Sequence, residues 1–153
     1  MDIRSEIQIK LKESLKSKEQ VATATIRLIL AALKDRDISA RGNGKADGVD
    51  DNEILSMLGS MIKQRKESAQ TYADAGRDDL AEREQSEIEV IQSFMPAQLE
   101  DDEVAKVIEE LIGETGAADI KDMGKVMGAL KERYAGQIDM GKAGGLVKEK
   151  LAG

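Results

Sequence analysis

The sequence predicts an all-α protein, in which an N-terminal bundle of about four helices precedes a small C-terminal domain of three helices. Two observations predict this class. The 153 residues include a single proline, 35% charged residues and abundant Ala, Leu, Ile, Glu and Lys, which is a helical composition. Apolar residues recur every three or four positions, and no segment alternates with a period of two. We therefore expect no β-sheet.

The first third of the chain predicts two helices and a loop. A four-residue spacing over residues 2–17 marks an amphipathic helix with the stripe Ile3, Ile7, Leu11 and Leu15. A second helix is predicted over about 20–40, with one face formed by Val21, Thr25, Leu28 and Ala32 and with Ile29 and Leu33 beside it. Residues 41–50, RGNGKADGVD, form the clearest loop. Its RGNGK motif could touch phosphate, but we interpret the loop as a flexible connector.

Capping signals predict where the next two helices begin and end. Asp50 and Glu53 fit a capping box that opens a third helix, which Gly76 ends. Asp78 or Asp79 is expected to cap a fourth helix, which Pro96 ends. The bases in the middle of the third helix are interpreted as a solvated face.

The segment Pro96-Ala97-Gln98 predicts a boundary between domains 1–95 and 96–153. It holds the only proline and coincides with a change in charge. Residues 96–116 carry seven acids and one base, whereas residues 117–153 carry seven bases and five acids. Asp101 or Asp102 is expected to cap a fifth helix, which ends at Gly113 and Gly116.

An internal repeat predicts the last two helices. The motif DMGK at residues 122–125 returns seventeen residues later at 139–142. In each copy the aspartate can cap a helix start, and glycines follow two and six positions later. A glycine inside a helix costs about 1 kcal/mol relative to alanine, so these glycines need an explanation.

Two explanations are compatible with the repeat. Glycines four residues apart make a flat strip on which another backbone can pack. Alternatively, the helix starts expose amide groups and the positive end of the helix dipole beside a lysine, which suits a phosphate. The candidate RNA- or phosphate-binding residues are then Gly124, Lys125, Gly128, Gly141, Lys142 and Gly145.

Composition excludes several classes of chemistry. The chain has no cysteine and no histidine, so we predict no catalytic residue, no metal site and no cofactor. The paired aspartates at helix starts are explained by capping. A net charge of −7 argues against nonspecific nucleic-acid binding through bulk charge. No run of residues suits a membrane span or a secretory signal, so we expect no membrane contact and a cytoplasmic protein.

Three segments resemble the YqeY family. They are IRLILAALKDRDI at 26–38, MIKQRKESAQTYADAGRDDLAEREQSEIEVIQSFMPAQL at 61–99 and KDMGKVMGALKERYAG at 121–136. Together they span nearly the whole chain. Residues 122–128 match the DMGKVMG motif of the family, whereas the second helix start reads DMGKAGG in place of the GKADG-like form of such tails.

The resemblance implies a function connected with tRNA. The YqeY family resembles the tail of the B subunit of the tRNA-dependent amidotransferase, where the tail helps to hold the outer part of the tRNA. The resemblance thus implies a tRNA-binding accessory module, with an aminoacyl-tRNA processing protein as a further partner. Family members are often labelled carbon–nitrogen ligases with glutamine as amido-nitrogen donor. This chain lacks the amidase and ATP-binding motifs, so we expect no activity from it alone. The alternative is a helical protein–protein interaction module.

Overall fold

The computed structural model describes residues 2–152, and all of the regular structure in this range is helical. Seven α-helices and one short 3₁₀ helix follow one another, with no strand among the described residues. The prediction of an all-α protein is therefore confirmed. The chain divides into two compact units, Met1–Pro96 and Ala97–Gly153.

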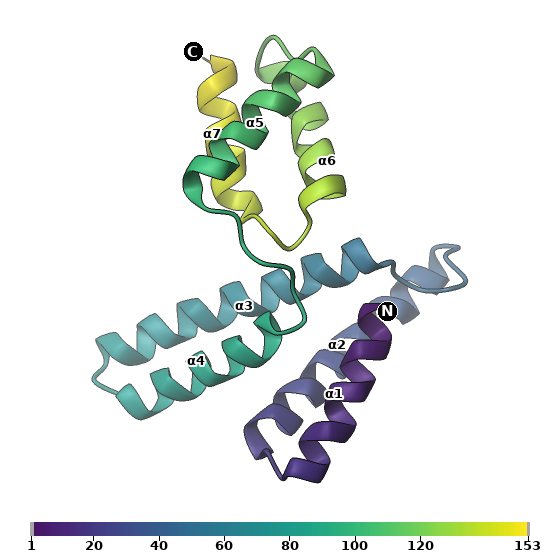
Figure 1. Ribbon diagram of the computed structural model, residues 1–153, viewed down its shortest axis with the longest axis vertical. Coiled ribbons are helices and arrows are strands. Elements are labelled where there is room, and N and C mark those ends of the chain that lie inside the picture. The colour runs from purple at the N-terminus through teal and green to yellow at the C-terminus, as the bar shows by residue number, and fades with distance from the viewer. Residues whose placement is uncertain (1, 153) are drawn as a thin grey trace. The chain divides into compact units, whose positions relative to one another are not determined.

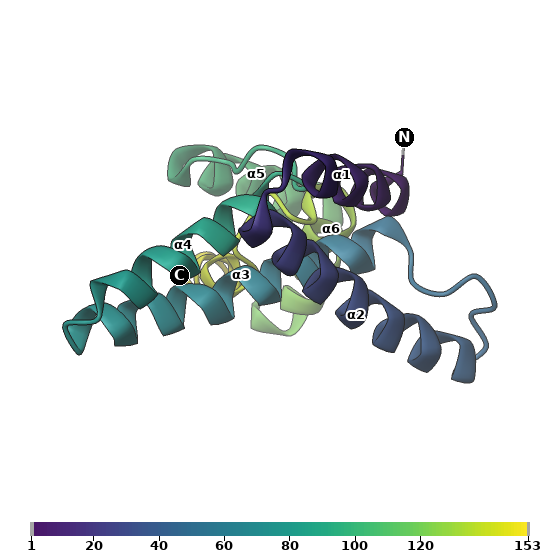
Figure 2. The same cartoon turned by 90° about the horizontal axis from the view of Figure 1, so that it is seen from below.

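The first unit consists of two helical hairpins. Helices α1 (Ile3–Ser17) and α2 (Gln20–Gly42) form one, and α3 (Asp51–Asp74) and α4 (Asp78–Gln92) form the other. The members of each hairpin run antiparallel side by side, as both Figure 1 and Figure 2 show. Helix α1 begins where the Asp2 carboxylate accepts a 2.7 Å hydrogen bond from the Ser5 amide.

The helix starts of the second hairpin differ from each other. Helix α3 has the predicted capping box, because Asp50 accepts from the Glu53 amide and Glu53 accepts from the Asp50 amide, both at 2.8 Å. The predicted caps of α4 are wrong. Arg77 holds the N-cap position, and Asp78 and Asp79 lie in the first turn of the helix. Asp79 instead pairs with the Arg77 guanidinium at 3.3 Å.

All four helices of the first unit contribute to one core, whose buried apolar residues are Ile7, Ile26, Ile29, Leu33, Ala40, Val49, Ile54, Met57, Leu58, Ile62, Ile88, Ile91 and Phe94. Three residues of the predicted stripes lie outside it, because Leu15, Val21 and Leu28 are 49%, 43% and 50% exposed. The α1–α2 contact instead includes Ser14 and Thr23, whose hydroxyls are 2.9 Å apart.

The second unit contains α5 (Asp101–Thr115), the 3₁₀ helix η1 (Ile120–Asp122), α6 (Met123–Tyr134) and α7 (Met140–Ala152). The segment after Pro96 belongs to this unit, since the Leu99 amide donates to the Gln137 carbonyl at 2.9 Å. Glu100, rather than Asp101 or Asp102, holds the N-cap position of α5. Its amide donates to the Glu103 carboxylate at 2.9 Å. Gly116, with φ 69°, ends α5 as predicted, whereas Gly113 lies inside the helix.

Helices α6 and α7 form an antiparallel pair in which the sequence repeat is also a repeat of burial (Figure 1). Val126 and Leu130 of α6 are fully buried, and so are Ala143 and Val147, seventeen residues later, in α7. Both copies thus turn the same positions toward the core of the second unit. The glycine positions lie on the opposite side of each helix, because they precede the buried positions by two residues.

Candidate functional site

The second copy of the repeat begins a helix as its sequence predicts. At the start of α7, Asp139 Oδ1 accepts hydrogen bonds from the amides of Gly141 at 2.9 Å and Lys142 at 3.3 Å. This is the arrangement of an N-cap, and it satisfies two of the amides that a helix start leaves unpaired. The expectation of open amides is therefore wrong here, because a carboxylate already occupies them. An anion at this helix start would have to displace Asp139 or bind elsewhere.

The first copy begins differently. The 3₁₀ helix η1 runs directly into α6, and the Asp122 side chain forms no cap bond to α6. It turns back and accepts from the Ala118 amide at 3.0 Å, while Asp119 caps η1 through the Lys121 amide at 2.9 Å. The hydrogen bond from Ala118, and more weakly the charge of Lys125, lowers the pKa of Asp122. The prediction of Asp122 as the cap fails because Asp119 offers an alternative cap three residues earlier.

Packing inside the fold does not account for the repeat glycines. A Cβ atom added to Gly124, Gly128 or Gly145 would have no atom within 4 Å, apart from its chain neighbours and its own helix backbone. At Gly141 the Cβ would be 3.2 Å from the neighbouring carboxylate of Asp139. Of the two explanations, the strip on which a backbone packs therefore requires a partner outside the second unit.

The two lysines of the repeat stand beside these glycines on exposed helix surface. The Lys125 side chain is 67% exposed and lies 3.6 Å from Asp122, a loose pair. Lys142 is exposed and forms no ion pair within residues 2–152. Nearby bases are engaged more closely, since Arg133 pairs with Glu114 and Lys150 with Glu109, both at 2.6 Å. Lys142 is thus available to an incoming anion, and Lys125 needs only a small movement.

The structure does not bring the six predicted residues into a single cluster. Because α6 and α7 are antiparallel, their starts lie at opposite ends of the helix pair (Figure 1). A rise of roughly 1.5 Å per residue makes α6, with its twelve residues, about 18 Å long. The repeat therefore forms two separate, similar surfaces, one with Gly124, Lys125 and Gly128 and one with Gly141, Lys142 and Gly145.

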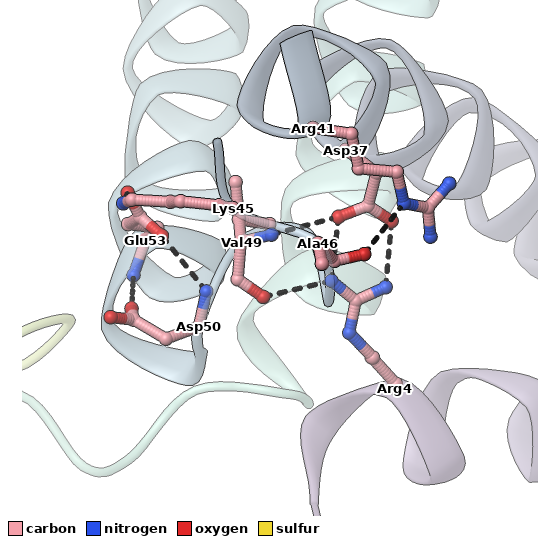
Figure 3. A network of polar contacts seen from close by, with 8 residues as sticks. All are labelled: Arg4, Asp37, Arg41, Lys45, Ala46, Val49, Asp50 and Glu53. Carbon is pink, nitrogen blue, oxygen red and sulfur yellow. Dashed lines mark hydrogen bonds and ion pairs between the residues drawn. The ribbon is translucent and has the colours of Figure 1, made fainter. Parts of the chain in front are cut away.

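A polar network in the first unit was missed by sequence reasoning (Figure 3). Arg4 of α1 donates to both carboxylate oxygens of Asp37 in α2, at 2.7 and 2.6 Å, and to the Val49 carbonyl at 2.8 Å. The Val49 amide donates back to Asp37 at 3.0 Å. Hydrogen bonds from Arg4, opposed by burial, lower the pKa of Asp37 to about 2. We call this set of three residues the Arg4 clamp.

The clamp and its neighbours fix the loop that was interpreted as a flexible connector. Gly48 has φ 81°, and an added Cβ would be only 2.3 Å from Asp37. Lys45 pairs with Glu53 of α3 at 2.5 Å, and Arg41 donates to the Ala46 carbonyl at 3.3 Å. These contacts order the end of α2 against the start of α3. The loop has a structural role in this fold.

One signal in the sequence could have found the clamp. Asp37 continues the buried series Ile26, Ile29 and Leu33 of α2 at a spacing of four residues, and it is only 6% exposed. A carboxylate at an apolar position of an amphipathic helix must be paired. The partner, Arg4, is thirty-three residues away in sequence, and periodicity cannot identify it.

The structure so far defines a helical protein whose first unit is fixed by an internal ion pair and whose second unit presents glycines and lysines outward. The chain belongs to the family described as Yqey-like protein, whose model matches residues 4–151.

Three curated relatives carry the name "Altered inheritance of mitochondria protein 41, mitochondrial". The protein of Clavispora lusitaniae is 32% identical over 117 residues, which are 75% of this chain and 65% of the relative. That of Lachancea thermotolerans is 29% identical over 82% of this chain and 68% of the relative. That of Saccharomyces cerevisiae is 28% identical over 78% of this chain and 65% of the relative. The chain therefore spans about two thirds of the length of these relatives.

These names contradict the cytoplasmic location expected from the sequence, since each relative is named as a mitochondrial protein. The expectation rested on the lack of a spanning segment and of a secretory signal. Neither feature distinguishes the cytosol from the mitochondrion. Among the helices of residues 2–152, none combines the length and the apolar character that crossing a membrane requires.

Proposed function

We propose that the chain binds folded RNA, in the first place tRNA, through the outward faces of α6 and α7. The observation that carries this proposal is the trio of open glycines, Gly124, Gly128 and Gly145. Alanine at each would stabilise the helices by about 1 kcal/mol, and the fold offers no steric reason against it. A surface that must bring its backbone close to a ligand accounts for glycine at these positions.

Charge supports a phosphate-bearing ligand. Lys125 and Lys142 flank the open glycines, and Lys142 lacks an ion-pair partner among the described residues. Because Asp139 occupies the amides at the start of α7, the phosphate contacts are assigned to the ammonium groups and not to the backbone. The glycines then allow the ribose-phosphate backbone to approach the helices.

The resemblance to the amidotransferase tail supports tRNA as the ligand and an accessory role. In this proposal the four-helix bundle and the C-terminal three-helix domain are separate modules, and RNA binding belongs to the second. An aminoacyl-tRNA processing protein would supply the chemistry. Incubation of the chain alone with Glu-tRNA(Gln), ATP and glutamine should yield no Gln-tRNA.

The test is the salt dependence of tRNA binding by the double variant Lys125→Ala, Lys142→Ala. Each phosphate contact contributes about 0.9 to the slope of log affinity against log salt on a duplex, so the slope should fall by about 2. The affinity for all tRNAs should fall to a similar extent, because phosphate contacts carry no sequence information. The double variant Lys10→Ala, Lys12→Ala changes the net charge equally on exposed positions of α1 and should bind as the parent does. Parental binding by the first variant, or no tRNA binding at low salt, would refute the proposal.

A protein–protein interaction module is the second candidate. Gly124 and Gly128 are one turn apart, about 6 Å along α6, and form a flat strip that a partner helix could meet. The two candidates differ in the nucleic acid that the protein carries. RNA retained during purification raises absorbance at 260 nm above that of the two tyrosines, whereas a protein partner does not.

A further inference from the structure

Helix α2 of the first unit carries an apolar surface that the core does not use. Val21, Leu28 and Ile38 are 43%, 50% and 57% exposed, and an apolar patch of this kind is more informative than a single exposed aliphatic residue. Two alanines lie between them on the same side, Ala24 and Ala31, and both are exposed. This surface is distinct from the repeat glycines and from the Arg4 clamp.

The exposed positions have the spacing of a coiled-coil seam. Intervals of three, four, three, four and three residues connect Val21, Ala24, Leu28, Ala31, Asp35 and Ile38. This is the alternation of a and d positions in successive heptads, with Val21 as the first a position. The buried residues of α2, including Ile26, Ile29 and Leu33, face the core from other positions. Helix α2 therefore has two apolar stripes, and only one is covered within this unit.

Charge along the seam is asymmetric. The g positions, which border one side, are Arg27, Lys34 and Arg41, all exposed and seven residues apart. None of the three forms an ion pair within residues 2–152, and Arg41 donates only to the Ala46 carbonyl. The other border is uncharged, since the e positions are threonine, alanine and serine. A row of unpaired bases is notable in a chain of net charge −7.

Asp35 adds a second requirement. It occupies an a position inside the seam, is exposed, and pairs with no base among the described residues. A helix laid on the seam would bury this carboxylate, and a buried charge needs a partner. A polar residue at an a position also fixes the register of a coiled coil. The incoming helix must therefore present a lysine or arginine opposite Asp35.

We propose that this face of α2 docks an acidic amphipathic helix of another protein. That helix carries aliphatic residues at a and d spacing, Asp or Glu along its borders, and one base facing Asp35. A second copy of α2 fits less well. In antiparallel register it places Arg27 beside Lys34 of the copy, and in parallel register it places the two Asp35 carboxylates together.

The test uses a fluorescent synthetic helix of three heptads with Leu at a and d, Glu at e and g, and one Lys facing Asp35. A matched peptide carries Lys in place of every Glu. With the full chain, the acidic peptide should bind at least tenfold more tightly than the basic one. Leu28→Glu should weaken the acidic peptide at least tenfold, whereas Ile9→Glu, an exposed apolar position of α1, should not.

A charge-reversal variant distinguishes specific recognition of the peptide from nonspecific binding. The variant Arg27→Glu, Lys34→Glu should prefer the basic peptide, with its helicity and melting temperature unchanged because both positions are exposed. Equal binding of both peptides, binding of neither, or no effect of Leu28→Glu would overturn the proposal. If analytical ultracentrifugation shows that the unmodified chain is a dimer and that Leu28→Glu dissociates it, the face binds a second copy instead.

Discussion

Glycine serves opposite purposes in the two units. In the loop of the first unit, Gly48 has positive φ, and a Cβ atom added there would be 2.3 Å from the Asp37 carboxylate. On α6 in the second unit, Gly124 and Gly128 have ordinary helical backbone and open space where a side chain would be. The fold thus needs Gly48, whereas it would be more stable without the glycines of α6.

This difference distinguishes residues kept for folding from residues kept for contact with another molecule. Around Gly48 the Arg4 clamp supplies a partner for each buried polar group that it contains. Among the described residues, no buried side-chain nitrogen or oxygen lacks a hydrogen bond. At the start of α7, Asp139 satisfies the amides of Gly141 and Lys142, and in both copies the repeat glycines and lysines stay outward. Stability and binding should therefore respond in opposite directions to the same substitution.

The largest effect is expected from Gly48→Ala. The added Cβ would be 2.3 Å from Asp37, and alanine at φ 81° is strained, so unfolding free energy should fall by about 3 kcal/mol. Gly44→Ala is the matched control, because Gly44 has φ 95° but open space around its Cβ. It should cost about 1 kcal/mol. Urea unfolding measures both, and equal losses would show that the contact with Asp37 does not restrict this position.

Asp37→Asn should lower the unfolding free energy by about 2 kcal/mol. The amide keeps the shape of the side chain but loses the charge-assisted hydrogen bonds with Arg4. Asp35→Asn, two residues away and exposed, should change it by less than about 0.5 kcal/mol. If both variants unfold at the same urea concentration, the Arg4 clamp does not stabilise the first unit.

The Arg4 clamp should also affect how the free energy of unfolding depends on pH in acid. Hydrogen bonds from Arg4 hold the pKa of Asp37 at about 2 in the folded chain, against an ordinary value of 3.8. The folded state therefore favours the charged carboxylate. This stabilisation, about 2 kcal/mol, is complete above pH 4 and is lost as the pH falls through 2. Thermal melts from pH 5 to 2 should show a steeper loss for the parent than for Asp37→Asn. Parallel curves would contradict the assignment.

The smallest effect, with the opposite sign, is expected in the second unit. Gly124→Ala and Gly128→Ala should each raise the unfolding free energy by up to about 1 kcal/mol, because alanine favours the helix and meets no atom. The same variants should weaken tRNA binding, since the methyl groups separate the ligand from the backbone. If the variants are more stable but bind tRNA as the parent does, these glycines do not belong to the RNA interface.

Local signals predicted the helices because these signals lie within a few residues of one another. The capping box of Asp50 and Glu53 is one case, and the end of α5 at Gly116 is another. Prediction failed where two local solutions compete. At the first repeat copy, Asp119 caps a helix start in place of Asp122. Between α1 and α2, Ser14 and Thr23 form the contact, whereas Leu15 and Val21 are exposed.

The sequence could propose candidate site residues but could not give their arrangement in space. The repeat identified the glycines and lysines, since duplication is visible in sequence. The separation of its two copies follows from the antiparallel course of α6 and α7, which depends on tertiary packing. The Arg4 clamp was invisible for a similar reason, because its ion pair joins residues distant in sequence.

Two antiparallel helices that carry the same motif are the arrangement that a twofold axis between them would relate. Val126 and Leu130 of α6 correspond to Ala143 and Val147 of α7, so the two copies bury the same positions. The backbones of a nucleic-acid duplex are related by axes of the same kind, because its two strands are antiparallel. A duplex centred on this axis would present one strand to each DMGK copy with the same polarity. The protein would then recognise the pairing of two strands, with one short motif used twice.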